Sequence, residues 1–209
     1  GGHTELVLMK DYGKYKIIGQ TLDDAAGEAF DKTARLLGLG FPGGPAIARE
    51  ATTTSNLKSE TRNKFRIQLP RPMINSKDYN FSFSGLKTAV LYLYNDLIKK
   101  HSVSEIRPAL AFEIQQSIVD VLAAKTLKAV KNCSPRSVMI AGGVSANKKL
   151  REAMAKKIAP HKIPLMIPNF AYTTDNAAMI AAAGYFNYLN KKPNKNSWKK
   201  LKADANLRL

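Results

Sequence analysis

SVMIAGGVSAN, residues 137–147, is the segment that says most about the fold. Its first five residues have the apolar composition of a short buried strand, and a double glycine then leads into a predicted helix over 145–158. A second apolar run, 163–167, follows that helix. Two short strands joined by a helix predict a right-handed βαβ unit with parallel strands. Ligands of such folds bind at the carboxyl ends of the strands, which is where the glycines lie.

The rest of the chain predicts a hairpin and several helices around this unit. Two apolar runs, 4–9 and 14–20, flank a short glycine-containing turn and indicate an antiparallel hairpin. The turn cluster 39–45 and the polar segment 52–80 predict loops. Four further helices are predicted at 25–37, 84–100 capped by Ser84, 105–132 capped by Ser104 with Pro108 in its first turn, and 175–189. The predicted fold class is α/β, a mixed sheet with flanking helices.

Composition excludes some classes of protein and favours one kind of partner. The 209 residues are 44% hydrophobic and 23% charged, which is typical of a globular chain and not of a disordered one. No apolar run is long enough to cross a membrane, and a single cysteine, Cys133, favours a reducing cytoplasm. Lys and Arg number 33 against 16 acids, a net charge of +17. This excess favours a polyanionic partner such as nucleic acid, although an ordinary basic domain is the alternative.

The acids concentrate in one predicted helix. Asp24, Glu28 and Asp31 fall at positions i, i+4 and i+7, so that they share one helix face. Like charges at this spacing repel by roughly 0.2–0.5 kcal/mol per pair. The helix dipole accounts for acids in the first turn but not for Asp31, two turns in. A ribose, or a magnesium ion bound through water, would explain the set.

Two other positions have both a functional and a structural interpretation. Gly1 and Gly2, directly before a strand, provide backbone N–H groups that can hold a phosphate, but glycines also simply form turns. Asp175 precedes the last helix and is either its N-cap or a metal ligand. The three histidines are too scattered to complete a metal site with it. The double glycine in 137–147 lacks both the dinucleotide and the P-loop spacing.

Seven segments, in the expected order, resemble the tRNA N6-adenosine threonylcarbamoyltransferase family, formerly called O-sialoglycoprotein endopeptidases or glycoproteases. They are GGHTE (1–5), TLDDAAGEAFDKTARLLGL (21–39), PGGP (42–45), FSFSGLKT (81–88), AGGVSAN (141–147), YTTDNAAMIA (172–181) and ADANLRL (203–209). The resemblance implies the second lobe of the actin, sugar-kinase and heat-shock-chaperone ATPase fold over 1–189, with a helical insertion at about 52–132. It also implies that the basic tail 190–209 returns to a first lobe. Because that lobe and its H-x-x-x-H metal pair are missing, we expect a chain truncated at its N-terminus that is inactive alone.

The resemblance also implies roles for individual residues. The reaction would transfer a threonylcarbamoyl group from threonylcarbamoyl-AMP to N6 of the adenosine next to the anticodon of tRNA. Asp175 would be one ligand of a single Fe²⁺ or Zn²⁺ ion. Asp24 and Glu28 would lie in the catalytic acidic segment. The nucleotide, which is ATP, AMP or the adenylate, would contact Gly1, Gly2, Asp31, Gly44 and Asn147.

The expected partners follow from the same resemblance. They are tRNA, a paralogous TsaB-like subunit and a small TsaE-like ATPase, with no membrane. The lysine-rich segment 191–202, with Trp198 in it, is either an arm that touches tRNA or a solvated surface. If this segment is only a solvated surface, we expect the tRNA to bind along Arg62, Lys64, Arg66 and Arg71 instead. A sugar-kinase-like or carbamoyltransferase-like ATPase and a non-catalytic basic scaffold are the alternative functions; without HExxH, a metalloprotease has little support.

Overall fold

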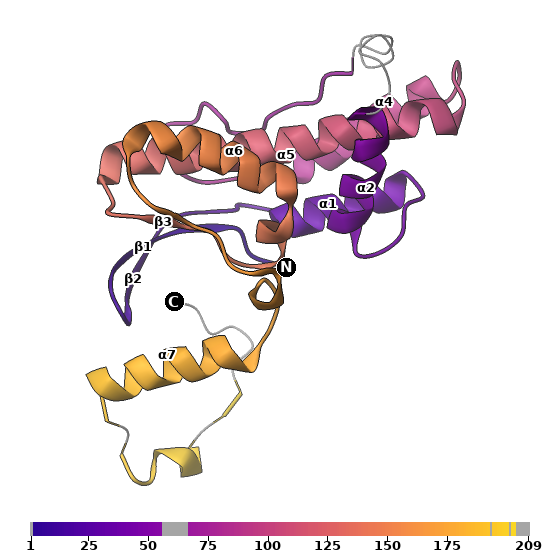
Figure 1. Ribbon diagram of the computed structural model, residues 1–209. Helices are drawn as coiled ribbons and strands as arrows, with labels where there is room; N and C mark the ends of the chain where they lie inside the picture. The colour runs from indigo at the N-terminus through magenta and orange to yellow at the C-terminus, as the bar shows by residue number, and fades with distance from the viewer. Residues whose placement is uncertain (1, 56–66, 193, 201, 204–209) are drawn as a thin grey trace.

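The computed structural model describes residues 2–55, 67–192, 194–200 and 202–203 (Figure 1). Its strands are β1 (Glu5–Asp11), β2 (Lys14–Gln20), β3 (Val138–Met139) and β4 (Leu165–Met166). Its α-helices are α1 (Ala26–Leu36), α2 (Gly43–Ser55), α4 (Ser84–Leu97), α5 (Val103–Cys133), α6 (Lys148–Ile158) and α7 (Ala177–Asn190). Short 3₁₀ turns are η1 (Gly143–Ala146), η2 (Ala159–His161), η3 (Phe170–Tyr172) and η4 (Ser197–Lys200).

The predicted hairpin is confirmed. β1 and β2 pair antiparallel, with Glu5 opposite Gln20, and Gly13 adopts φ +74° in the turn. Beyond the hairpin, Thr21 forms a parallel bridge with Phe81. Glycine is required at position 19 because a Cβ there would lie 2.2 Å from the carbonyl oxygen of Tyr79. The hairpin is thereby held against the segment that leads into α4.

The βαβ unit is also confirmed, but the single mixed sheet is wrong. β3 and β4 pair in parallel, with Val138 opposite Leu165. Within the described residues, β1–β2 and β3–β4 form separate two-stranded sheets. The strands of the second sheet are only two residues long, so they offer few backbone groups for pairing with the hairpin. The structure is thus a mixture of helices and small sheets.

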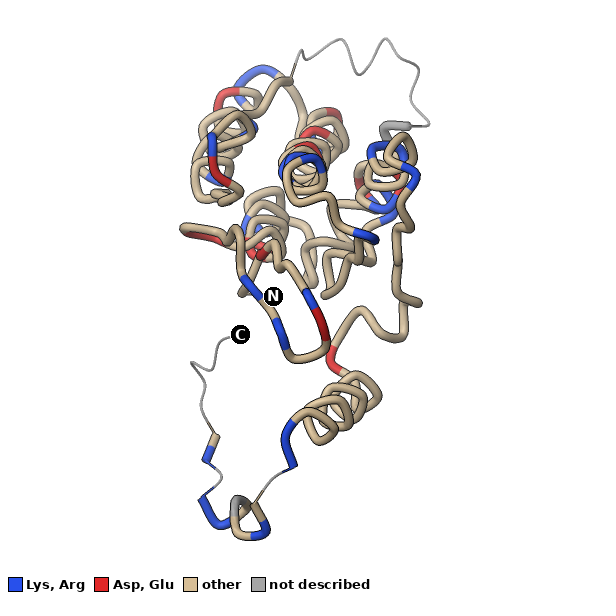
Figure 2. Tube along the Cα trace, turned by 90° about the vertical axis from the view of Figure 1, so that its left-hand side faces the viewer, with Lys and Arg blue, Asp and Glu red and all other residues tan. Residues whose placement is uncertain are grey.

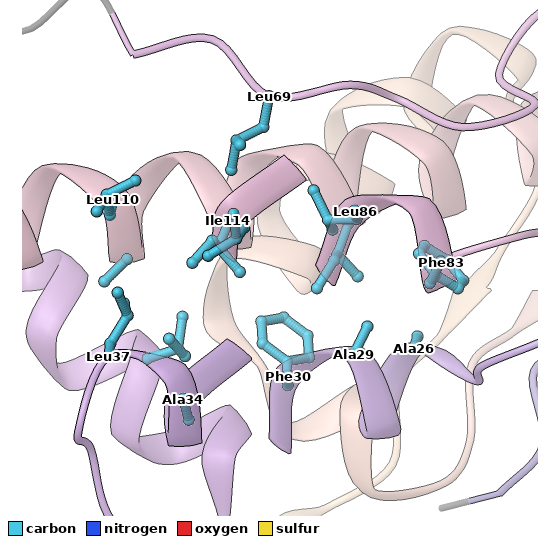
Figure 3. Packing of buried hydrophobic residues seen from close by; sticks show 14 of the residues in the cluster. Ala26, Ala29, Phe30, Ala34, Leu37, Leu69, Phe83, Leu86, Leu110 and Ile114 are labelled. Carbon is cyan, nitrogen blue, oxygen red and sulfur yellow. The ribbon is translucent and has the colours of Figure 1, made fainter. Parts of the chain in front are cut away.

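Helices α1, α2, α4 and α5 enclose the main hydrophobic core (Figure 3). Phe30 of α1 lies at its centre, facing Leu86 of α4 and Ile114 of α5. All three side chains are at most 2% exposed. The loop residue Leu69 closes the core from the other side of α5. A smaller hydrophobic cluster joins α5 to α6 and the β3–β4 sheet. α5 therefore contributes residues to both clusters.

Several predicted helix boundaries are wrong by one to three residues, and one helix was not predicted. α2 begins inside the predicted loop 39–45 and continues into the predicted loop 52–80. Phe83 rather than Ser84 is the N-cap of α4. Ser102 rather than Ser104 caps α5, because the Glu105 carboxylate accepts a hydrogen bond from its backbone N–H. Pro108 is consequently the sixth residue of α5 and not in its first turn.

α7 differs from the other helices. None of its residues is buried, and Figure 1 shows it apart from the helical body, below the hairpin. Its N-cap is Asn176, whose side chain accepts a hydrogen bond from the N–H of Met179. Asp175 therefore precedes the cap and is not the cap itself. Among the described residues no helix is both long and apolar enough to cross a membrane.

Candidate functional site

Asp23 connects the acidic segment before α1 to the start of α4. Its carboxylate accepts hydrogen bonds from the backbone N–H groups of Phe83 and Ser84 and from the hydroxyls of Ser82 and Ser84, at 2.6–3.2 Å. Partial burial acts to raise the pKa of Asp23, but the hydrogen bonds from Ser82 and Ser84 outweigh it and lower that pKa. Asp23 thus caps α4 and holds the neighbouring Asp24 at a fixed distance from that helix.

Lys32 binds the two candidate catalytic acids together. Its ammonium lies 2.5 Å from Oδ1 of Asp24 and 3.3 Å from Oε1 of Glu28. The other oxygen of Glu28 accepts a hydrogen bond from the backbone N–H of Ala25, 3.1 Å away. This N–H, followed by the ammonium of Lys32, lowers the pKa of Glu28. A carboxylate held in this way is a weak proton acceptor.

Asp31 connects α1 to the glycine-rich turn. Its Oδ1 accepts a hydrogen bond from the backbone N–H of Gly43, the first residue of α2, at 2.7 Å. A Cβ at position 43 would lie 2.5 Å from the Cα of Asp31, so glycine is required for the two helices to approach this closely. Asp31 is half-exposed, and within the described residues its Oδ2 makes no hydrogen bond or ion pair. It is available to accept a hydrogen bond from a ligand hydroxyl.

Two of the candidate glycines, Gly2 and Gly44, have free space where a side chain would be. A Cβ at Gly2 or at Gly44 would meet no atom of the described chain within 4 Å, so these positions leave room for a ligand. Gly1 lies outside the described residues. Packing against α1 therefore requires glycine at position 43 and not at position 44, which the sequence had singled out.

Asn147 is the N-cap of α6. Its Oδ1 accepts a hydrogen bond from the N–H of Leu150 at 3.0 Å, and its Nδ2 donates one to Oε1 of Gln115 on α5 at 2.8 Å. Gln115 is itself buried. The turn η1 that precedes Asn147 packs against α1, and Val144 of this turn contacts the main core. The acidic helix and the glycine turn after β3 are therefore neighbours.

Asp175 is exposed and lies in the two-residue link between Thr173, which is buried, and the N-cap of α7. In the described part of the chain its carboxylate makes no hydrogen bond or ion pair. It lines an open depression with the first residues of α7, among them Met179 and Ile180. No group of three or more histidine, cysteine or acidic side chains among the described residues is arranged to hold a metal.

The sequence analysis did not identify four residues that organise this site. Gln115 had no signal in the pattern, and Gly43 was part of the PGGP segment but was not singled out in it. Lys32 had one, since it stands four residues after Glu28 on the same helix face. Asp23 could not have been recognised, because its partners are about 60 residues away in the chain.

Of the basic residues considered for the tRNA path, Arg71 is already paired. Its guanidinium contacts the carboxylates of Glu113 and Asp120 on α5 and the carbonyl oxygen of Leu69. Its side chain is only 22% exposed. Arg71 therefore fastens the 67–80 segment to α5 and is a poor candidate for a phosphate contact. Arg62, Lys64 and Arg66 lie outside the described residues.

Known proteins resemble this chain over most of its length. The sequence model of the family described as tRNA N6-adenosine threonylcarbamoyltransferase matches residues 1–182. A relative with that name from Thermosipho africanus is 48% identical over 185 residues, which is 88% of this chain and 53% of the relative. One from Bacillus subtilis is 49% identical over 186 residues, 88% of this chain and 51% of the relative. The chain thus spans about half the length of the curated relatives it matches. It belongs to the tRNA N6-adenosine threonylcarbamoyltransferase family.

Proposed function

We propose that this chain forms part of an enzyme that transfers a threonylcarbamoyl group from threonylcarbamoyl-AMP to N6 of the adenosine adjacent to the tRNA anticodon. The observation that carries the proposal is the family match over residues 1–182, together with relatives of that name at 48% and 49% identity. The excess of 33 basic over 16 acidic residues suits a nucleic-acid substrate. The packing of η1 on α1 suits a nucleotide held between two segments.

The reaction requires positioning more than activation of the acyl group. The N6 amine attacks the carbamoyl carbon, the bond from that carbon to the phosphate oxygen breaks, AMP leaves with the electron pair, and N6 loses a proton. The mixed anhydride is already reactive, so the enzyme gains most by aligning amine and carbonyl and by stabilising the departing phosphate. Backbone N–H groups at Gly2 are suited to the phosphate.

The nucleotide would lie against the α1–η1 contact. Asp31 would accept a ribose hydroxyl at Oδ2 while Oδ1 keeps its hydrogen bond to Gly43. Asn147 would contact the nucleotide through the second N–H of its amide, since the first is held by Gln115. Gly44 would allow the nucleotide to approach the start of α2, where the structure leaves open space.

Asp24 and Glu28 would act in this reaction by position and charge. Both are bound to Lys32, and the pKa of Glu28 is lowered, so neither is suited to accept the proton from N6. Their fixed negative charge would instead hold Lys32 in place. The Lys32 side chain is 36% exposed, and its ammonium forms ion pairs with Asp24 and Glu28.

Asp175 would be one ligand of a divalent iron or zinc ion. The observation that supports this is a carboxylate that is exposed and makes no hydrogen bond or ion pair within the described residues. Such an ion, when bound, would act as a Lewis acid and draw electrons from the threonylcarbamoyl carbonyl. ATP or AMP would be the further nucleotide ligands of the enzyme.

The larger assembly is also part of the proposal. Residues 1–189 would be the second lobe of an actin-like and sugar-kinase-like ATPase fold, and the tail 190–209 would return to the first lobe. A paralogous TsaB-like subunit and a small TsaE-like ATPase would be the protein partners, in the cytoplasm. The hairpin followed by a parallel βαβ unit is compatible with such a lobe.

The function is tested by supplying the activated substrate directly. The full-length protein is incubated with threonylcarbamoyl-AMP and an unmodified tRNA transcript, and nucleosides are then analysed by mass spectrometry. We expect threonylcarbamoyladenosine to form. Absence of the modified nucleoside, with a protein that is folded and metal-loaded, would refute the proposed activity.

The metal ligand is tested separately with Asp175→Ala in the same protein. Because the exposed carboxylate makes no hydrogen bond or ion pair within the described residues, we expect unchanged thermal unfolding but loss of bound metal and of transfer activity together. Asp96→Ala is the matched control, since the Asp96 side chain is 65% exposed and forms an ion pair with the exposed Lys99. A near-normal transfer rate and metal content in Asp175→Ala would show that the ligand assignment is wrong.

A further inference from the structure

The tip of the β1–β2 hairpin meets the C-terminal end of α7, although the two are far apart in sequence. The ring of Tyr12 stacks on Phe186 with centroids 3.6 Å apart and planes 3° from parallel. The side-chain amide of Asn190 donates a hydrogen bond to the carbonyl oxygen of Tyr12 at 2.9 Å. Figures 1 and 2 show the hairpin tip above this end of the helix from two directions. The contact is therefore built from both stacking and hydrogen bonding.

Positive charge gathers on both sides of this contact. Lys10, Lys14 and Lys16 are exposed on the hairpin, and Lys191 and Lys192 follow Asn190 directly. Figure 2 shows these lysines as blue segments on the hairpin and just beyond α7. We call the three hairpin lysines, Lys10, Lys14 and Lys16, the basic tip. One acidic residue, Asp11, lies beside these lysines. Its carboxylate is 3.5 Å from the ammonium of Lys14, and both side chains are at least 60% exposed.

Exposed aromatic rings lie among these lysines. Tyr12 and Tyr15 of the hairpin are 48% and 44% exposed, and Tyr185 and Tyr188 of α7 are 59% and 51% exposed. Lysines next to accessible rings are the combination with which proteins hold single-stranded nucleic acid, because the ammonium groups bind phosphates while bases stack on the rings. RNA would use both the lysines and an exposed ring such as Tyr15, whereas an acidic protein surface needs the lysines alone.

We propose that the basic tip binds single-stranded RNA, with the lysines on the phosphates and Tyr15 as a platform for a base. In the context of the proposed function, on which this choice of ligand rests, the RNA would be an unpaired segment of the tRNA substrate. The tip is separate from α1 and Asp175, so it contributes affinity and orientation and takes no part in the chemical step. An acidic protein partner is the competing occupant.

The test compares two triple variants of the full-length protein. Lys10, Lys14 and Lys16 are changed together to Gln; the matched control changes Lys87, Lys99 and Lys100, which are exposed on α4 and just after it. Binding of a fluorescent tRNA transcript is measured by anisotropy over a series of salt concentrations. We expect the tip variant to raise Kd about tenfold near 0.15 M salt and to reduce the salt slope by roughly 2, and the control to change Kd less than about twofold.

Further variants separate charge from folding and from stacking. Replacing Lys10, Lys14 and Lys16 with Arg keeps the charge, so we expect it to retain wild-type affinity. Tyr15→Leu keeps an apolar side chain but removes the ring, so we expect a weaker Kd with an unchanged salt slope. Thermal unfolding of all variants is compared with wild type, since exposed lysines make no packing contacts to lose.

The outcomes distinguish this inference from the proposed function. If the tip variant and the control bind tRNA alike, or if Tyr15→Leu has no effect, the RNA surface is refuted whether or not the wild type transfers threonylcarbamoyl. If the wild type lacks transferase activity while the tip variant still binds RNA more weakly than the control, the proposed function fails and the RNA surface stands. Displacement of tRNA by poly-glutamate at concentrations equal to those of competing RNA would assign the surface to an acidic protein instead.

Discussion

α5 and α7 are both rich in apolar residues, yet α5 is the most buried helix of the structure and α7 has no buried residue. α5 packs against α1, α2 and α4 on one side and against α6 on the other, so residues along its whole length are buried. In α7, Ile180 is 67% exposed and Leu189 is 59% exposed. Apolar composition alone therefore did not determine burial; the presence of elements on both sides of α5 did. The two helices are expected to respond very differently to the same substitution.

The largest expected difference is between Ile114→Ala and Ile180→Ala. Ile114 is 0% exposed at the centre of the main core, so truncation should lower the free energy of unfolding by about 2–5 kcal/mol. Ile180→Ala removes a side chain that is mostly in water and should change it by less than about 0.5 kcal/mol. Urea denaturation of the 209-residue chain measures both. Equal losses would show that α7 is packed in solution.

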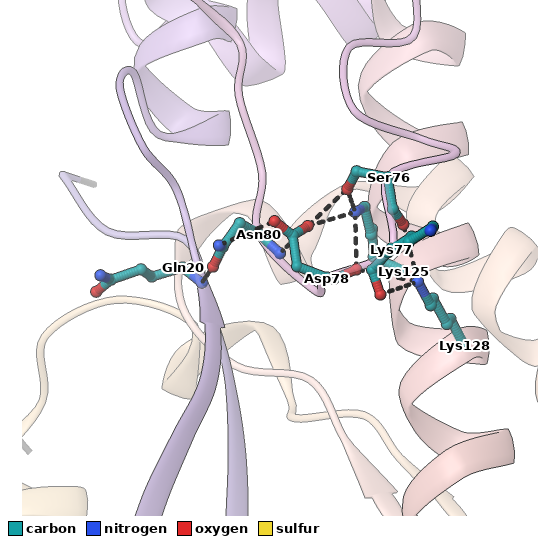
Figure 4. A network of polar contacts seen from close by, with 7 residues as sticks. All are labelled: Gln20, Ser76, Lys77, Asp78, Asn80, Lys125 and Lys128. Atoms are coloured by element: carbon teal, nitrogen blue, oxygen red, sulfur yellow. Dashed lines mark hydrogen bonds and ion pairs between the residues drawn. The ribbon is translucent and has the colours of Figure 1, made fainter.

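A second prediction concerns the polar side of α5. The ammonium of Lys125, whose side chain is 0% exposed, donates hydrogen bonds to the hydroxyl of Ser76 and to the carbonyl and carboxylate oxygens of Asp78 (Figure 4). Asn80 continues this network to the backbone N–H of Gln20 at the end of β2. Lys125→Met should lower the free energy of unfolding by about 1–3 kcal/mol, because Ser76 and Asp78 lose a charged hydrogen-bond donor.

Lys131→Met is the matched control for Lys125→Met. It lies on the same helix but is exposed, so we expect a change within about 0.5 kcal/mol. The network also joins the 76–80 segment to the hairpin. Amide hydrogen exchange in β2 should therefore become faster in Lys125→Met and stay unchanged in Lys131→Met. Equal exchange in the two variants would mean that the hairpin is held by other contacts.

A third prediction follows from the charge of Asp78. Hydrogen bonds from Ser76, and then Lys125, lower the pKa of Asp78 from 3.8 to about 2. The unfolded chain therefore binds the proton more readily, and the stability that this carboxylate contributes is complete above about pH 4 and is lost as pH falls toward 2. In Asp78→Asn, the decrease in unfolding free energy between pH 4 and pH 2 should be smaller than in wild type. An identical decrease would contradict the lowered pKa.

The sequence predicted what depends on local pattern. The hairpin follows from two apolar runs around Gly13, and the parallel βαβ unit from two apolar runs around a helix, so both were found with small errors at their ends. The helix that carries Glu28 and Asp31 was found for the same reason, and these two share a face because helical spacing fixes it. Asp24 precedes the N-cap, Ala25, so the helix face predicted for all three acids is wrong for Asp24.

What could not be predicted depends on contacts between distant parts of the chain. Asp31 holds the start of α2, and Asn147 both caps α6 and binds Gln115 on α5. The spacing of residues does not show that a polar side chain proposed for a ligand already has a protein partner. The prediction of a single mixed sheet was wrong for a similar reason. Whether the hairpin pairs with β3 depends on contacts between distant segments, which the periodicity of the sequence does not show.

The smallest effect is expected in the basic tail. Within the described residues of 191–202, Trp198 is 70% exposed and its ring has the ammonium of Lys199 5.6 Å from its centroid. Trp198→Ala should therefore leave the free energy of unfolding within about 0.5 kcal/mol of wild type, and changing Lys195, Lys199, Lys200 and Lys202 together to Gln should do the same. If the tail is an RNA-binding arm, the four-lysine variant will flatten the salt slope of tRNA binding by up to about one unit per lost phosphate contact. A measurable loss of stability in Trp198→Ala would instead show that the ring packs against the rest of the protein.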